Sequence, residues 1–253
     1  MKPVHSDSLI RSESEQKIMR QAGQILQSVL DRLVDRATVG TTTLELDQLA
    51  ETLIRQAGAE PTFKGFHDYP FATCMSVNEA VVHGLPDQRR LQAGDLLGID
   101  VGLRYQGWCV DSARTIGIGA ITPEATQLLK VTEQALEAGL TAVRDGITTL
   151  ELGTIISAVC KPYHFGVVRE LTGHGIGQEQ WEEPSIPNYP EKRGNFTLRS
   201  GMTIAIEPMV TLGSPEVYQA RDGWTIVTAD HSLAAHFEAT VIVQADRAEI
   251  LVK

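Results

Sequence analysis

Five residues with metal-binding side chains stand inside or beside apolar segments, where an unpaired charge is costly to bury. They are Asp100, Asp111, His174, Glu207 and Glu238. One imidazole nitrogen among carboxylate oxygens is a ligand set that suits Mn²⁺, Fe²⁺, Co²⁺ or Zn²⁺. Two such ions, about 3.5 to 4 Å apart, can share carboxylates and a bridging hydroxide, which is a strong nucleophile. The residue types therefore predict a site for two divalent metal ions.

The first two carboxylates should meet across a β-hairpin. The segments DLLGIDVGLRY (residues 95–105) and WCVDSARTIG (residues 108–117) flank a turn around residues 105–107. With the turn centred there, Asp100 and Asp111 lie directly opposite each other, with Cβ atoms about 5 Å apart on one face. Two ionised carboxylates at that distance repel each other, and a bound cation relieves the repulsion.

An internal duplication relates the acids of the two halves. The segment LQAGDLLGIDVG (residues 91–102) resembles LRSGMTIAIEPM (residues 198–209), which aligns Asp100 with Glu207. A second pair, GTTTLEL and GITTLEL, begins at Gly40 and Gly146, at nearly the same offset. One ancestral unit used twice explains both matches. We therefore expect Glu207 and Glu238 to take the parts of Asp100 and Asp111, and the longer connection at 209–232 to overhang the site.

The elements that carry these residues follow a repeated scheme. A possible capping box at Ser12 and Glu15, followed by apolar residues at helical spacing, predicts a helix over residues 12–36. Thr122 and Pro123 begin a predicted helix over residues 122–144, and two further helices are expected over 43–57 and 149–160. Strand-like runs fill the intervals at 72–78, 95–105, 108–119, 166–173, 203–210, 224–229 and 235–244. Two helices followed by strands, twice over, indicate the α+β class. With no linker in sight, we expect one domain over residues 1–253, with halves of roughly 12–120 and 121–250.

Composition narrows the class of protein. A net charge of −10 and a pI near 5.2 argue against a dedicated nucleic-acid binder. No apolar run approaches the roughly 18 residues that a membrane span requires, and the N-terminus lacks a signal-peptide core. The cysteines, Cys74, Cys109 and Cys160, form no disulfide framework or zinc-binding spacing. These features favour a cytoplasmic protein without a membrane partner.

Five motifs then resemble those of a known family. The segments SVNEAVVHGLPD, GIDVGLRYQGWCVDSART, ELTGHGIG, TIAIEPMV and HFEATVIV occur in the order and spacing of the type I methionine aminopeptidases. The resemblance implies the pita-bread fold, two pseudo-twofold related halves around a curved antiparallel sheet. It implies removal of the N-terminal methionine from peptides and nascent proteins by a metal-bridging hydroxide. It also implies two divalent ions, a monomer and transient ribosome association.

The resemblance assigns roles to individual residues. The five candidate ligands match the family's metal ligands, with Asp111 and Glu238 as those that bridge both ions. His83 and Glu207 match the catalytic residues, with Glu207 moving the proton and His83 contacting substrate. The substrate-binding positions are His83, Phe66, Tyr69, Cys74, Trp181 and Trp224.

The chain departs from the family at three positions. Trp181 stands where a second active-site histidine is usual, Gln180 replaces a pocket phenylalanine, and Ala239 replaces a histidine. Because tryptophan has no titratable proton and no acceptor, we predict a slow enzyme. Gln180 predicts a more polar pocket rim and relaxed specificity.

Two alternatives to a methionine aminopeptidase remain. They are an Xaa-Pro dipeptidase or aminopeptidase of the same fold and a non-catalytic peptide-binding protein. The remaining histidines are expected to be structural or exposed: His5, His67, His164, His231 and His236.

Overall fold

The helices begin where the sequence places their capping residues. The computed structural model describes residues 9–253, with α-helices α1 Glu13–Arg36, α2 Thr43–Gln56, α3 Pro123–Ala142 and α4 Thr149–Cys160. Capping boxes at Ser12, Thr42 and Thr148 satisfy the first free N–H groups of α1, α2 and α4. Thr122 caps α3, with proline in its first turn. The four predicted helices are confirmed, although the third ends at Ala142 rather than Arg144.

Between residues 9 and 253 the chain also forms fifteen strands and two short 3₁₀ turns, which are joined by loops. The strands are β1 Glu60–Pro61, β2 Thr73–Val77, β3 Ala80–Val82, β4 Leu96–Tyr105, β5 Trp108–Gly117, β6 Gly166–Val167, β7 Gly173–Gly175, β8 Glu182–Ile186, β9 Thr203–Ile206, β10 Met209–Thr211, β11 Val217–Gln219, β12 Ile226–Thr228, β13 Ala234–His236, β14 Ala239–Val243 and β15 Ala248–Val252, and the turns are η2 Phe66–Asp68 and η3 Lys161–Tyr163.

Three predicted strands differ from those observed. The runs at 203–210 and 235–244 each divide into two strands, at Glu207-Pro208 and at Phe237-Glu238. Proline has no N–H for a ladder hydrogen bond, which accounts for the first interruption. The run at 166–173 contributes only the two-residue strand β6 at its start, and Gly173 already belongs to β7. Both interruptions contain a predicted metal ligand, so Glu207 and Glu238 lie at breaks between two strands.

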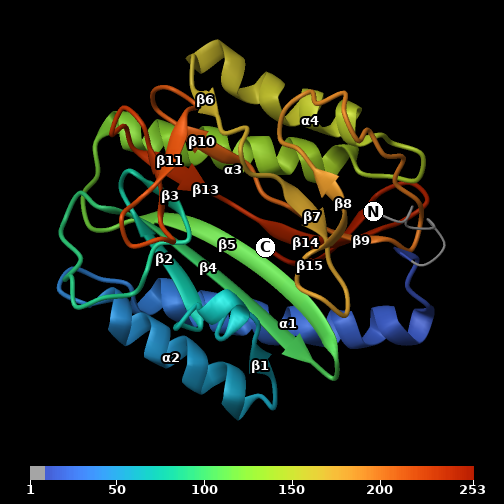
Figure 1. The fold of residues 1–253 in the computed structure, drawn as a ribbon, viewed down its shortest axis with the longest axis horizontal. Coiled ribbons are helices and arrows are strands. Elements are labelled where there is room, and N and C mark those ends of the chain that lie inside the picture. The colour runs from blue at the N-terminus through green and yellow to red at the C-terminus, as the bar shows by residue number, and fades with distance from the viewer. Residues whose placement is uncertain (1–8) are drawn as a thin grey trace.

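All strand pairs are antiparallel, and they form four small sheets that adjoin one another. In Figure 1, α1 and α2 lie along one side of the strands and α3 and α4 along the other, with the long β4–β5 hairpin between them. One apolar core packs α1 and α2 against β4 and β5, and a second packs α3 and α4 against β9 and β14. This is an α+β architecture, as predicted.

Corresponding residues of the two halves make corresponding contacts. The bridge between Thr42 and Arg90 recurs between Thr148 and Thr197. The hydrogen bond from Gly40 N to Leu91 O, at 2.8 Å, recurs from Gly146 N to Leu198 O, at 2.9 Å. The duplicated sequence segments therefore hold their helices and strands in the same way.

Candidate metal centre

The β4–β5 hairpin carries Asp100 and Asp111 on one face, but not opposite each other. Its turn is centred one residue later than predicted, so Tyr105 pairs with Trp108, Asp100 with Ala113 and Gly102 with Asp111. The prediction of direct opposition was wrong. Because residues two apart on a strand share a face, the two carboxylates are diagonal neighbours, whose spacing of roughly 7 Å leaves room for a cation between them.

His174 is held rigidly in β7 between two glycines. A Cβ atom at Gly173 would lie 2.4 Å from Ala205 O, and one at Gly175 would lie 2.1 Å from Glu183 O. The glycines are thus needed for close strand packing. The ring Nδ1 lies 2.8 Å from Gly175 O, and donation to that carbonyl leaves Nε2 with a free lone pair. This arrangement is typical of a metal-ligating histidine.

Glu207 and Glu238 lie side by side where the second half's sheet is interrupted. The pairs Ile206 with Ala239 and Met209 with His236 place them level with each other. Asn188 Nδ2 donates to the Glu207 carbonyl at 2.9 Å. The Glu238 N–H donates to Ala113 O at 2.8 Å, so this ligand is tied directly to the first half.

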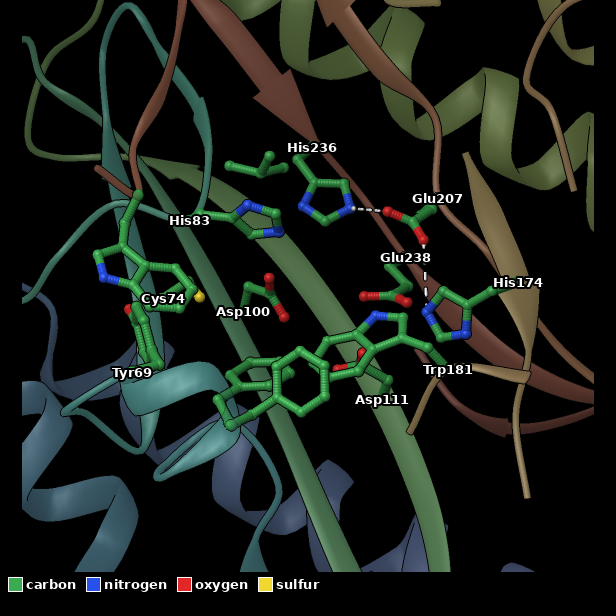
Figure 2. Close-up of a pocket in the computed structure, with 14 residues that line it drawn as sticks. Tyr69, Cys74, His83, Asp100, Asp111, His174, Trp181, Glu207, His236 and Glu238 are labelled. Atoms are coloured by element: carbon green, nitrogen blue, oxygen red, sulfur yellow. Dashed lines mark ion pairs between the residues drawn. The ribbon is translucent and has the colours of Figure 1, made fainter. Parts of the chain in front are cut away.

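The five side chains converge on one pocket (Figure 2). Ligand atoms of Asp111, His174 and Glu238 lie within 4.8 Å of one another. One oxygen of each of Asp100, Asp111 and Glu238 is buried without a hydrogen-bond partner in the described part of the chain. Burial raises the pKa of all four carboxyl groups, and their mutual repulsion raises those of Asp111 and Glu238 further. Unpaired oxygens and crowded acids are what a divalent cation would satisfy, so the residues fit the metal that the sequence predicts.

The predicted substrate-binding residues line the same pocket. Its walls comprise Phe63, Phe66, Tyr69, Cys74, Val82, His83, Asp100, Asp111, His174, Trp181, Glu207, Trp224, His236 and Glu238. The hydroxyl of Tyr69 donates to Thr73 O at 2.9 Å, which anchors this side chain at the pocket wall. Trp224 packs edge-on against Tyr69, with ring centroids 4.9 Å apart. Trp224 belongs to the connection at 209–232, which therefore reaches the site as expected.

His83 is half-buried at the pocket wall in a left-handed backbone conformation, with φ of 57°. Burial, with a smaller effect from His236, lowers the pKa of His83 to about 4. At neutral pH the imidazole is therefore uncharged. It can offer one N–H donor and one acceptor nitrogen to a bound molecule.

His236 is a pocket residue that the sequence interpretation missed. It was expected to be structural or exposed, yet it is buried beside His83 with Nε2 3.5 Å from Glu207 Oε2 (Figure 2). The register explains the error, because Asp100 pairs with Ala113 whereas Glu207 is level with Glu238. The counterpart of Glu238 is therefore Ala113, and the counterpart of Asp111 is His236. Aligning DSART (residues 111–115) with HFEAT (residues 236–240) would have shown that Asp111 corresponds to His236.

The three departures from the family motif lie in different environments. Gln180 is buried, with 4% of its surface exposed, and donates from Nε2 to Asp111 Oδ2. It does not line the pocket, so the predicted polar rim was wrong. Trp181 is 40% exposed at the pocket mouth, with ring centroids 4.2 Å from Phe66 and 6.1 Å from Phe63. Ala239 is fully buried in β14, away from the cavity.

Three other histidines, His67, His164 and His231, and two cysteines, Cys109 and Cys160, do not line the pocket. His67, His164 and His231 are exposed, as predicted, and His5 lies outside the described residues. Cys74, Cys109 and Cys160 are buried free thiols. Between residues 9 and 253, no helix is both long and apolar enough to cross a lipid bilayer.

Comparison with known proteins identifies close relatives along almost the whole chain. The pattern of metallopeptidase family M24 matches residues 17–245. The chain is 40% identical over 243 residues to a methionine aminopeptidase of Clostridium perfringens, a match that covers 96% of this chain and 98% of that protein. The structure of a methionine aminopeptidase from Thermotoga maritima superimposes with a TM-score of 0.94 at 38% identity, covering 96% and 98% of the two chains.

A prolidase from Pyrococcus furiosus has the same fold at lower similarity. Its TM-score is 0.78 at 26% identity, and the match covers 97% of this chain but only 65% of the prolidase. Together these neighbours confirm the predicted pita-bread fold.

Proposed function

Because this chain belongs to metallopeptidase family M24, we propose that it is a methionine aminopeptidase, which removes the N-terminal methionine from peptides and nascent proteins. The observation that carries the proposal is that the five candidate ligands share one pocket with five aromatic side chains, a thiol, a valine and two further histidines. An apolar, sulfur-containing pocket suits the flexible thioether of methionine.

The metal would be held by Asp100, Asp111, His174, Glu207 and Glu238, with Asp111 and Glu238 shared between two ions. A bound divalent ion lowers the pKa of water and stabilises negative charge on an oxygen. An assay with added metal decides whether the bound ion is cobalt, manganese, iron or zinc.

The residues around the metal ligands would orient the peptide. Phe66, Tyr69, Cys74 and Trp224 form the part of the pocket that receives the methionine side chain. The neutral imidazole of His83 would hydrogen-bond the scissile amide, and its left-handed backbone keeps the ring in place. Glu207, whose pKa burial raises, would accept a proton from the attacking water and pass it to the leaving amine.

Trp181 would close the pocket mouth rather than take part in proton transfer. Its indole N–H can donate to an oxygen of the substrate, but it has no acceptor and no proton to exchange. Loss of one donor to a developing oxyanion typically lowers the rate by about 10²- to 10³-fold. We therefore propose a slow aminopeptidase.

The test is a panel of X-Ala-Ser tripeptides assayed with the metal-free protein after addition of Mn²⁺, Co²⁺, Fe²⁺ or Zn²⁺. We expect cleavage of Met-Ala-Ser with at least one metal, and little cleavage of the other tripeptides. Asp111→Asn is the matched inactive control, because it keeps the side-chain volume and removes a shared ligand charge. Equal cleavage of all tripeptides would refute the specificity.

Two other outcomes would replace the proposal. Cleavage of Xaa-Pro peptides without cleavage of Met-Ala-Ser would assign the chain to the prolidase-like branch of the fold. Binding of two metal ions with no hydrolysis of any peptide would indicate a peptide-binding protein. Each result comes from the same preparation, so the three functions can be compared directly.

We also propose the compartment, the oligomeric state and the partner of the enzyme. Three free, buried thiols suit the reducing cytoplasm, where nascent chains are made. We propose a monomer made of a single catalytic domain that meets its substrates in transient association with the ribosome. Sedimentation of the purified protein, alone and with ribosomes, tests both statements.

A further inference from the structure

His236 occupies the position in the second half that Asp111 occupies in the first. Gly102 pairs with Asp111 in the β4–β5 hairpin, and Met209 pairs with His236 between β10 and β13. The duplicated segments align Gly102 with Met209. A proposed metal ligand in one half therefore corresponds to a buried imidazole in the other.

The backbone of His236 is held as tightly as that of Asp111, and by the same device. Thr115 Oγ1 accepts from the N–H of His236 at 2.9 Å and donates to its carbonyl at 2.8 Å. In the mirrored contact, Thr240 Oγ1 accepts from the N–H of Asp111 at 2.9 Å and donates to its carbonyl at 2.7 Å. Each half thus uses a threonine to fix the site residue of the other half. We call these paired contacts the threonine clamps.

The Nε2 of His236 faces the candidate ligand Glu207 and has no hydrogen-bond partner among the described residues. Only 4% of His236 is exposed, and its buried Nε2 makes no hydrogen bond. Nε2 lies 3.5 Å from Glu207 Oε2, while His174 Nε2 lies 3.6 Å from Oε1 of the same carboxylate. Glu207 therefore sits between two imidazoles, one on each oxygen. A contact of 3.5 Å is at the outer limit of a hydrogen bond, and such contacts shorten when a site is filled.

We propose that His236 is a positioning residue of the metal centre, whose Nε2–H holds the outer oxygen of Glu207 while the inner oxygen faces the metal beside His174. A neutral imidazole has one N–H to donate, and Nε2 is directed at Oε2 by the Thr115 clamp. Fixing the free oxygen of a ligating carboxylate limits its rotation and strengthens its bond to the cation. The inference rests on metal use by the proposed function, but not on the identity of the peptide.

The test measures Co²⁺ binding in the absence of peptide. Metal-free wild type, His236→Leu and His236→Gln are titrated with Co²⁺ by calorimetry, and the visible absorption of bound Co²⁺ is recorded. We expect His236→Leu to weaken the binding of at least one Co²⁺ by about 10- to 100-fold and to change its spectrum. His236→Gln keeps an N–H donor and should recover most of the affinity. His164→Gln, at an exposed histidine, is the control.

Two results would overturn the proposal. Wild-type affinity and spectrum in His236→Leu would mean that the imidazole does not act on Glu207. Equal losses in His236→Leu and His236→Gln would mean that the ring acts only by packing. If the leucine variant does not fold, His236→Asn, whose amide is too short to reach Glu207, takes its place beside His236→Gln. Because no peptide is present, failure here is distinguishable from failure of the proposed aminopeptidase activity.

Discussion

The threonine clamps predict that one buried hydroxyl supports both the fold and the metal site. Among the strands between residues 9 and 253, β5 pairs only with β4, so at Asp111 none of them lies along its outer edge to receive the backbone N–H and C=O. The fully buried hydroxyl of Thr240 takes the place of that strand with two hydrogen bonds. Thr240→Val keeps the shape of the side chain and leaves both backbone groups unpaired.

The cost of this substitution follows from the two groups left without partners. Each unsatisfied buried polar group costs about 1–3 kcal/mol, so for two groups we expect Thr240→Val to lower the free energy of unfolding by about 2–6 kcal/mol. For a chain of this length, that corresponds to a fall in Tm on the order of 5–25 °C. The backbone of Asp111 should also shift, which weakens Co²⁺ binding. Thermal unfolding of the metal-free protein and calorimetric titration with Co²⁺ measure the two effects.

A matched variant separates the clamp from the general loss of a buried hydroxyl. Thr132 is equally buried, but its hydroxyl donates to Leu128 O one turn earlier in α3 and leaves no backbone group unpaired when removed. We expect Thr132→Val to cost less than about 1 kcal/mol and to leave Co²⁺ affinity unchanged. If Thr240→Val is no more destabilising than Thr132→Val, the reasoning about the strand edge is wrong.

Three further predictions concern the site itself. Trp181→His should raise kcat/KM on Met-Ala-Ser by about 10²- to 10³-fold, and an unchanged value would show that this position does not limit the rate. Gln180→Leu removes the N–H donor to Asp111 and should weaken Co²⁺ binding by about 10- to 100-fold in calorimetry, whereas wild-type affinity would mean that the contact is incidental. Burial raises the pKa of Asp100 and Glu207 from near 4 to about 7. Acids with a raised pKa in the folded state stabilise it when protonated, so the Tm of the metal-free protein should fall as pH rises from 4 to 8, and added Mn²⁺ should reverse the fall; a Tm that rises over this range would contradict it.

The sequence was most informative where local rules decide the structure. The capping box predicted at Ser12 and Glu15 is present, and α1, which follows it, ends at Arg36 as predicted. The duplicated segments correctly align Asp100 with Glu207, because identical turns and caps precede both strands. The five candidate ligands were all named from the sequence and all lie in one pocket.

The errors arose where the outcome depends on pairing between distant strands. A shift of the hairpin turn by one residue moved the partner of Asp100 from Asp111 to Ala113, and it concealed the equivalence of Asp111 with His236. Gln180 was expected at the pocket rim because it stands where the resembling family has a pocket phenylalanine. Its inward direction is fixed by the hydrogen bond that its Nε2 donates to Asp111 Oδ2, and no local pattern in the sequence reveals that partner.

The reciprocal anchoring across the seam has a consequence for the lifetime of the protein in a cell. Each half secures the backbone at or beside a candidate ligand of the other, so we expect loss of the metal to loosen both halves together rather than one loop alone. We expect chelated copies to be degraded much faster than loaded ones during limited proteolysis. A cell short of the metal would then clear the idle enzyme instead of accumulating it.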